Sequence, residues 1–161
     1  MATTMDLVRA HLEAEDRRDV EGALTSFSDD CSYRMDTFGI DLRGKPAIAD
    51  HYRGAFKAMP NFANDKNGEM FDGGDDVFRL GYFQVTQSGP WKDLPASGRD
   101  VKVWVLAHFP RAPDGQLGGE SVWFNGNDFL HQLGHLPSAN AMELARYIKE
   151  LEDEIAKLES Q

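Results

Sequence analysis

Two titratable side chains, Asp36 and His108, are the first candidates for proton transfer in this sequence. Asp36 stands at the end of a predicted strand, where a carboxylate could serve as a general base. His108 alternates with Trp104 and Leu106, so these side chains would share one face of a strand, and a neutral imidazole there would titrate near physiological pH. Each candidate also has a structural interpretation. Asp36 could pair with Arg34 or cap a turn, and His108 could be a hydrogen-bonded histidine of the core or of an interface.

Amide and phenol groups supply possible hydrogen-bond donors for a substrate oxygen. Asn125 and Gln87 cannot usefully accept a proton, but their NH2 groups can hold a carbonyl or an oxyanion. Tyr33 and Tyr82 offer phenol donors, although a buried tyrosine usually finds a partner for its hydroxyl and so does not by itself indicate catalysis. Asn125 followed by Gly126 is equally typical of a turn that ends a strand, and Gln87 could simply position a loop.

Two further titratable features carry weaker signals. Glu120, in a predicted strand, could be an acid with a raised pKa, or it could lie on the outer face or bond Arg99 as part of the scaffold. His131 and His135 have the spacing of a helical metal pair. Gly134 interrupts that pair and no third ligand stands nearby in the sequence, so no metal site is expected.

Aromatic and methionine side chains are numerous enough to wall a cavity as well as to fill a core. A cavity walled in this way would suit a flat, multi-ring small molecule. Trp91 lies in a loop between Gly89 and Gly98 that could cover the mouth of such a cavity. The candidate wall residues are Met35, Phe38, Phe56, Met59, Phe62, Trp91, Trp104 and Trp123.

Composition narrows the class of protein. The chain has 161 residues, a net charge of −10 and one cysteine, Cys31, which excludes an internal disulfide framework. The average negative field would repel nucleic acid and anionic membrane surfaces, so the expected partner is a small hydrophobic molecule. No secretory leader and no apolar run of about 18 residues is visible, which predicts a cytoplasmic protein without a membrane span.

Helical spacing comes first along the chain and strand patterns follow. Pro46 suits the first turn of a helix because its missing N–H costs nothing there. Helices followed by a run of strands indicate an α+β domain with a curved sheet and helices on one face. The predicted helices end near Arg18, Phe27 and Met59, and the predicted strands cover 31–36, 75–86, 101–111 and 116–124.

Residues 136–161 are predicted to form a C-terminal amphipathic helix outside the domain of residues 1–135. Asn140 and Glu143 have the spacing of a capping box. The apolar stripe could drive a two-stranded coiled coil, although its flanking glutamates would then set like charges together. Packing on its own domain or on the body of a second subunit is the favoured alternative. The stripe consists of Ala141, Leu144, Ile148, Leu151, Ile155 and Leu158.

Two segments carry a resemblance to a known family. Thr86–Arg99 (TQSGPWKDLPASGR) and Asn125–Gly134 (NGNDFLHQLG) resemble signatures of the SnoaL-like polyketide cyclases, within the nuclear-transport-factor-2-like and ketosteroid-isomerase-like superfamily. Weaker matches in the same order begin at Leu7. The resemblance implies a cone-shaped fold with a curved antiparallel sheet and the N-terminal helices on its concave face, here with an extra C-terminal helix. It also implies a homodimer or a higher homo-oligomer.

The family reaction implied is an intramolecular aldol cyclisation, in which a base removes a carbon-bound proton and a donor stabilises the enolate. Gln87 stands where the family usually has histidine, and Asn125 stands where it usually has the acid/base aspartate. Asp36 or His108 would then be the base. Tyr33 or one of the two amides would supply the donor.

The resemblance therefore implies an enzyme that needs no cofactor and performs cyclisation, isomerisation or dehydration on a hydrophobic carbonyl or polyketide-like substrate. The alternative is a non-catalytic small-molecule-binding protein on the same fold, in which amides have replaced the acid/base groups.

Overall fold

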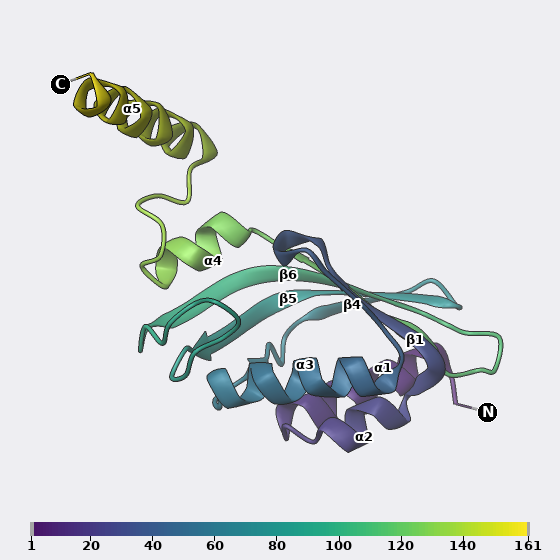
Figure 1. Ribbon diagram of the computed structural model, residues 1–161. Coiled ribbons are helices and arrows are strands. Elements are labelled where there is room, and N and C mark those ends of the chain that lie inside the picture. The colour runs from purple at the N-terminus through teal and green to yellow at the C-terminus, as the bar shows by residue number, and fades with distance from the viewer. Residues whose placement is uncertain (1, 161) are drawn as a thin grey trace.

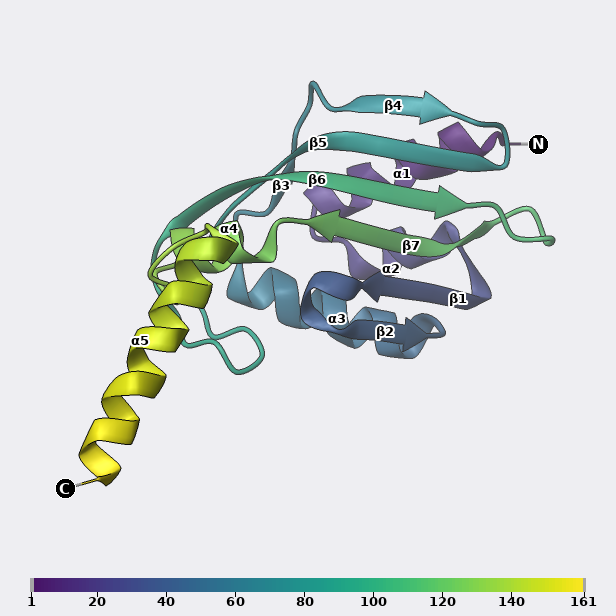
Figure 2. The same cartoon turned by 90° about the horizontal axis from the view of Figure 1, so that it is seen from above.

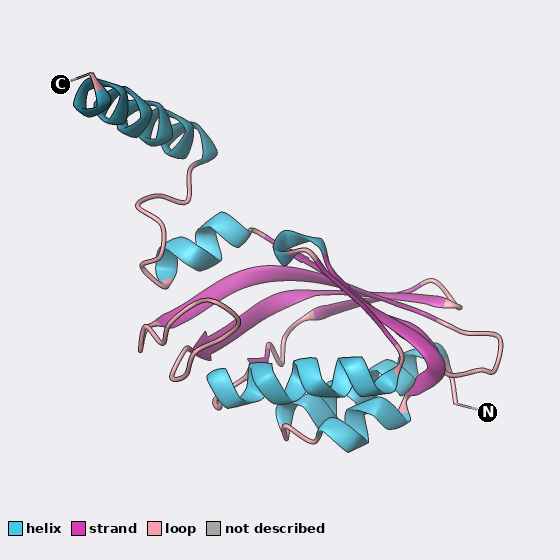
Figure 3. Cartoon of the chain, viewed as in Figure 1, coloured by secondary structure: helices cyan, strands magenta, loops and turns pink. Residues whose placement is uncertain are grey.

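The computed structural model describes residues 2–160 and shows a layer of helices beneath a curved sheet (Figures 1 and 3). Helices α1 (Thr4–Asp16), α2 (Val20–Thr25) and α3 (Lys45–Ala58) lie on the concave side of the sheet. Local signals start each helix: Thr3 and Asp6 form a capping box at α1, and Asp19 caps α2. Pro46 occupies the first turn of α3. The predicted α+β class and the position of the N-terminal helices are confirmed.

Seven strands form one sheet in the order β2-β1-β7-β6-β5-β3, with β4 also paired to β5 (Figure 2). Strands β1 and β7 run parallel, whereas all other pairs in the described chain are antiparallel, so the expected antiparallel sheet is in fact mixed. No hairpin joins β1 to β7, so the two strands are not required to run antiparallel. The strands are β1 (Phe27–Met35), β2 (Ile40–Arg43), β3 (Ala63–Asn64), β4 (Glu69–Asp72), β5 (Asp76–Thr86), β6 (Asp100–Pro110) and β7 (Leu117–Phe124).

The contact between β1 and β7 depends on a glycine. Gly119 has a φ of 131°, and a side chain at this position would collide with the backbone of Ser32. The parallel register then sets Glu120 beside Tyr33. Glu120 of the last strand and Tyr33 of the first strand therefore lie side by side above the helices.

Strands β5 and β6 carry apolar side chains on both faces. Val105 is buried on the concave face, whereas its neighbour Trp104 is 53% exposed on the convex face. On β5, Arg79 lies on the concave face and Phe78 on the convex face, where it pairs with His108. The alternation of β6 therefore turns the His108 face away from the helices.

The C-terminal segment leaves the body of the domain. Helix α4 (Gly126–Gln132) is tied to β6, because Gln132 exchanges two hydrogen bonds with the backbone of Lys102. Helix α5 (Ala141–Glu159) then extends away from the sheet (Figures 1 and 2). Among residues 2–160, no helix combines the length and apolarity that a membrane span requires.

Helix α5 begins at the predicted cap, Asn140, and does not pack on its own domain, while packing on a second subunit stays a prediction. The Asn140 side chain accepts hydrogen bonds from the backbone N–H groups of Met142 and Glu143, while the Glu143 carboxylate accepts the hydroxyl of Ser138. No side chain of α5 is buried, so packing of α5 on its own domain is ruled out. The exposed apolar residues of this helix are Met142, Tyr147, Ile148, Leu151, Ile155 and Leu158.

We expect a chain ending at Pro137 to form particles with fewer copies of the chain than the full-length protein does. The number of copies is the particle mass from light scattering at equal concentration, divided by the mass of one chain. An apolar stripe of this length is the surface that a second copy would cover. Far-ultraviolet circular dichroism should show that the shortened chain keeps its sheet. Equal assembly states for the two chains would exclude α5 from oligomerisation.

Candidate functional site

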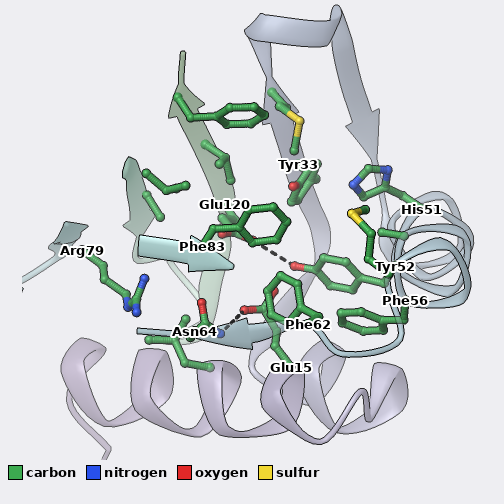
Figure 4. Close-up of a pocket in the computed structure, with 18 of the residues that line it drawn as sticks. Glu15, Tyr33, His51, Tyr52, Phe56, Phe62, Asn64, Arg79, Phe83 and Glu120 are labelled. Atoms are coloured by element: carbon green, nitrogen blue, oxygen red, sulfur yellow. Dashed lines mark hydrogen bonds between the residues drawn. The ribbon is translucent and has the colours of Figure 1, made fainter. Parts of the chain in front are cut away.

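A cavity lies between helices α1 and α3 and the concave face of the sheet (Figure 4). Its free volume is about 90 Å³, and about 790 Å³ lies between its walls when the open mouth is included. Its wall is mostly aromatic and aliphatic, and polar groups gather at one end. The polar lining residues are Glu15, Tyr33, His51, Tyr52, Asn64, Arg79 and Glu120.

His11 lies directly behind this polar end and is fully buried. Its Nδ1 is 3.1 Å from the Ala23 carbonyl oxygen and 3.1 Å from the Ser26 hydroxyl oxygen. A carbonyl only accepts hydrogen bonds, so Nδ1 carries a proton and donates it. The ring also stacks on Phe27 with centroids 4.6 Å apart, which fixes the direction in which Nε2 points.

Two carboxylates face the Nε2 atom of His11. Glu15 Oε1 lies 3.5 Å away and Glu120 Oε2 lies 3.8 Å away. Burial lowers the pKa of His11, but the charges of Glu15 and Glu120 outweigh burial and raise that pKa to about 10. His11 is therefore an imidazolium at neutral pH, placed between two buried carboxyl groups.

Glu120 is the carboxyl group that is best placed to exchange a proton with a ligand. Burial and the nearby Glu15 raise its pKa, while His11 and Tyr52 partly offset that rise. The Tyr52 hydroxyl donates to Glu120 Oε2 at 2.9 Å. No group in residues 2–160 donates a hydrogen bond to Glu120 Oε1, and Glu120 lines the cavity, so Oε1 is open to a ligand.

Tyr33 and His51 add two neutral polar groups at the same end. Burial raises the pKa of Tyr33 well above its usual value, so the hydroxyl keeps its proton. Burial, assisted by Lys92, lowers the pKa of His51 to about 4, so this imidazole is neutral. Their rings lie 4.6 Å apart. Neither side chain is hydrogen-bonded to another described residue, which leaves both available to a ligand.

Asn64 and Arg79 form the far side of the polar end (Figure 4). Asn64 Nδ2 donates to Glu15 Oε2 at 3.2 Å, which holds that carboxylate from the side opposite His11. Arg79 Nη2 donates to the Asp65 carbonyl oxygen at 2.8 Å. The site thus contains a carboxyl with a raised pKa, neutral donors and a buried cation within one cavity.

His11, Glu15 and Glu120 are also the described residues that could hold a metal ion. One potential ligand atom from each lies within 4.8 Å of the others. A cation could bind there only after His11 lost its Nε2 proton, because a ligating imidazole must offer a lone pair. The raised pKa of His11 favours the proton over a metal at neutral pH.

Comparison with known proteins identifies the family. Residues 8–117 match the SnoaL-like domain, which is more than half of the chain. The chain belongs to the SnoaL-like family. The matched range ends at the start of β7, so the segment from Asn125 to Gly134 lies outside it. No curated protein matches the sequence.

Solved structures support the fold of this SnoaL-like chain. A candidate polyketide cyclase from Pseudomonas putida is 18% identical with a TM-score of 0.73, over 82% of this chain and 98% of that one. AclR, a candidate hydroxylase from Streptomyces galilaeus, is 19% identical with a TM-score of 0.70, over 83% and 97%. A ketosteroid-isomerase-like protein from Catenulispora acidiphila, in complex with trimethylamine, is 16% identical with a TM-score of 0.69, over 82% and 95%.

Six residues expected in the site of this SnoaL-like chain do line the cavity, Phe62 among them. Tyr33 and Met35 come from β1, Phe56 and Met59 from the end of α3, and Trp91 from the loop before β6. Trp91 is buried and packs edge-on against Phe38 and Phe129. The loop that carries Trp91 therefore forms part of the wall in this structure.

Neither predicted base lies in the cavity. Asp36 begins the short 3-10 turn η1 (Asp36–Phe38) and accepts a hydrogen bond from Arg34 Nε at 2.7 Å, which lowers the pKa of this half-exposed carboxyl. His108 faces the convex side, stacks on Phe78 and lies 2.7 Å from Asp76 Oδ1. Both assignments are corrected: Asp36 takes the alternative pairing with Arg34, and His108 belongs to the outer surface of the sheet.

The remaining predicted residues have structural roles. Trp104 and Trp123 are 53% and 37% exposed on the convex face and do not line the cavity. Asn125 caps α4 by accepting the backbone N–H of Asp128 at 3.1 Å. Gln87 is buried and donates to the Pro95 carbonyl oxygen at 3.0 Å, so it positions the loop before β6. None of these four side chains lines the cavity.

The sequence held a signal for the residues that were missed. Thr4, Val8, His11 and Glu15 recur at helical spacing and share the buried face of α1. A histidine and a glutamate at core positions of an amphipathic helix are rarely buried without partners. That mismatch between residue type and position indicates a buried polar cluster, even though it does not show that Glu120 and Tyr52 complete it.

The free energy of unfolding should fall as the pH rises above 6.5. The folded protein keeps the His11 proton to about pH 10, whereas the unfolded chain releases it near the usual histidine pKa of 6.5. The slope from this one group is at most about 1.4 kcal/mol per pH unit. Urea unfolding from pH 6.5 to about 8.5, below the usual range of tyrosine, would measure it.

The His11→Gln variant should unfold at lower urea and should lose most of this slope. His108→Gln is the matched control, because His108 lies outside the cluster, and it should keep the slope. A wild-type free energy that stays level or rises over this pH range would contradict the charged state assigned to His11.

Proposed function

We propose that this SnoaL-like chain is an enzyme that performs acid/base chemistry on a hydrophobic carbonyl compound without a cofactor. The observation that carries the proposal is Glu120, a buried carboxyl with a raised pKa and an open oxygen in an aromatic cavity. Such burial is the usual way to bring a carboxyl toward the pH at which it can both take up and return a proton.

The first step is removal of a proton from the carbon beside the carbonyl group. Glu120 Oε1 accepts the proton, the C–H bond breaks, and its electron pair moves into the enolate. The hydroxyl of Tyr33 or an N–H of His51 donates to the enolate oxygen. Because both groups are neutral, they can donate without competing for the proton that Glu120 holds.

His11 and Tyr52 act through Glu120 as positioning residues. The Tyr52 hydroxyl occupies Oε2, which leaves Oε1 as the reactive oxygen. The positive charge of the His11 imidazolium stabilises the negative charge of Glu120 when that carboxyl is ionised. It stabilises the charge of Glu15 in the same way. Reprotonation of the enolate at another carbon gives an isomer, attack on a second carbonyl gives a ring, and loss of a neighbouring hydroxyl gives a dehydration product.

Several similar structures are candidate polyketide cyclases, which supports a related small-molecule enzyme or binder but does not identify a reaction. The alternative is a binding protein in which the cluster of His11, Glu15 and Glu120 only stabilises the fold. Its self-contained hydrogen bonds favour that alternative. A proton-exchange measurement distinguishes the two, because a binder has no reason to remove a carbon-bound proton.

We expect the protein to accelerate the exchange of the α-protons of 2-tetralone in D2O, followed by proton nuclear magnetic resonance. This probe is a flat, apolar ketone with acidic C–H bonds, so exchange reports the first step alone. Glu120→Gln should lower the rate by about 100-fold or more, since a positioned base contributes about 10²–10⁴. No exchange above buffer by the folded wild-type protein would favour the binder.

Matched variants separate the cavity from the surface. Glu13→Gln is the control for charge loss on α1, because Glu13 is exposed there. Asp36→Asn and His108→Ala should also keep the wild-type rate, since neither residue lines the cavity. A large loss of exchange in either of these variants, with Glu120→Gln unaffected, would return the catalytic role to the residues first expected from sequence.

A further inference from the structure

Arg79 is a buried cation without an ion-pair partner. Its side chain is 5% exposed and lines the cavity from β5. Exposed arginines such as Arg34 and Arg53 form ion pairs, but no carboxylate oxygen in residues 2–160 lies within 4.0 Å of the buried Arg79 guanidinium. Its Nη2 donates to the Asp65 carbonyl oxygen at 2.8 Å, which uses one of the five N–H donors of the guanidinium.

The fold makes room for this guanidinium. A Cβ atom at Gly68 would lie 2.8 Å from Arg79 Nη2, and one at Gly81 would lie 3.2 Å from it. Side chains at these positions would therefore displace the group. The Asp65 carbonyl oxygen holds one end of the Arg79 guanidinium, and the remaining N–H donors of that group are left for another acceptor. A buried charge normally has a partner, so the arrangement points to one that the chain itself does not provide.

The charges around Arg79 are already engaged elsewhere. Asp65 holds its carboxylate on the backbone N–H groups of Asn67 and Tyr82, which lower its pKa, and the charge of nearby Arg79 adds to that shift. Glu15 is held by Asn64 and His11. In Figure 4, Arg79 lies on the far side of Asn64 from Glu15. An anion beside Arg79 would therefore have Asn64 between it and the Glu15 carboxylate.

We propose that the cavity binds a hydrophobic carboxylic acid whose carboxylate pairs with Arg79. The planar fork of arginine matches a carboxylate through two parallel hydrogen bonds. A phosphate would bring up to two negative charges into a cavity that already holds Glu15 and Glu120, in a protein of net charge −10. The apolar part of the acid lies against the aromatic wall formed by Phe62, Phe83 and Phe129. This inference rests on the proposed function and narrows its substrate to a carbonyl compound that carries a carboxylate.

Isothermal titration with trans-cinnamate and trans-cinnamamide at neutral pH tests the pairing. The two compounds share one shape and differ in charge. The wild-type protein should bind the acid at least about 10-fold more tightly than the amide, the discrimination expected when a buried charge is left unpaired. Arg79→Gln should reduce this ratio to about one while changing the affinity for the amide by less than about threefold.

Two further variants keep the test decisive. Arg79→Lys preserves the charge but loses the fork, so it should retain a smaller preference for the acid. Arg43→Gln removes an exposed arginine and should leave the ratio unchanged. Because the ratio compares two ligands on one sample, partial unfolding of Arg79→Gln does not imitate the effect. A wild-type ratio near one, no binding of either compound, or a ratio that survives Arg79→Gln would overturn the proposal.

The wild-type protein also separates this inference from the proposed function. Exchange of 2-tetralone without a preference for cinnamate would overturn the carboxylate site alone. A preference for cinnamate that depends on Arg79, without exchange of 2-tetralone, would support the carboxylate site and overturn the proposed chemistry.

Discussion

The imidazolium of His11, held between Glu15 and Glu120, is the interaction on which the interior depends. Two carboxyl groups and an imidazole are costly to bury unless they share charge and hydrogen bonds. Here the carbonyl of Ala23 orients the ring, and Tyr52 occupies one oxygen of Glu120. Loss of His11 would leave two buried carboxyl groups without their cation, so α1 and β7 must keep their relative positions for the cluster to exist.

The same cluster determines the chemical character of the cavity. Apolar walls raise the pKa of Glu120 and lower that of His51, so a proton acceptor and a neutral imidazole coexist at one pH. Gly119 contributes to this arrangement, because only the close approach of β7 to β1 sets Glu120 beside Tyr33. The scaffold and the site are therefore linked through a single backbone contact.

The sequence predicted the elements better than the site because elements depend on local patterns. The signals for these elements involve residues that are close in the sequence: the helix caps, Pro46, and the alternation of buried and exposed residues in β5 and β6. The alternation does not say which face meets the helices, since Trp104 and Val105 are both apolar. The interpretation of His108 failed for this reason. Helix α5 was predicted from its own residues, but what covers its stripe depends on another surface and stays a prediction.

The positions where the family usually has titratable groups have become structural in this chain. Asn125 now caps α4, and Gln87 holds the loop before β6, so neither can supply a proton. The carboxyl groups that face the cavity come instead from α1 and β7, on other parts of its wall. A cone closed by helices offers several inward positions, and at one of them burial raises the pKa of Glu120. The groups that give this cavity its polar end are therefore set by which inward positions carry carboxyl side chains, and they need not occupy the positions of the family motif.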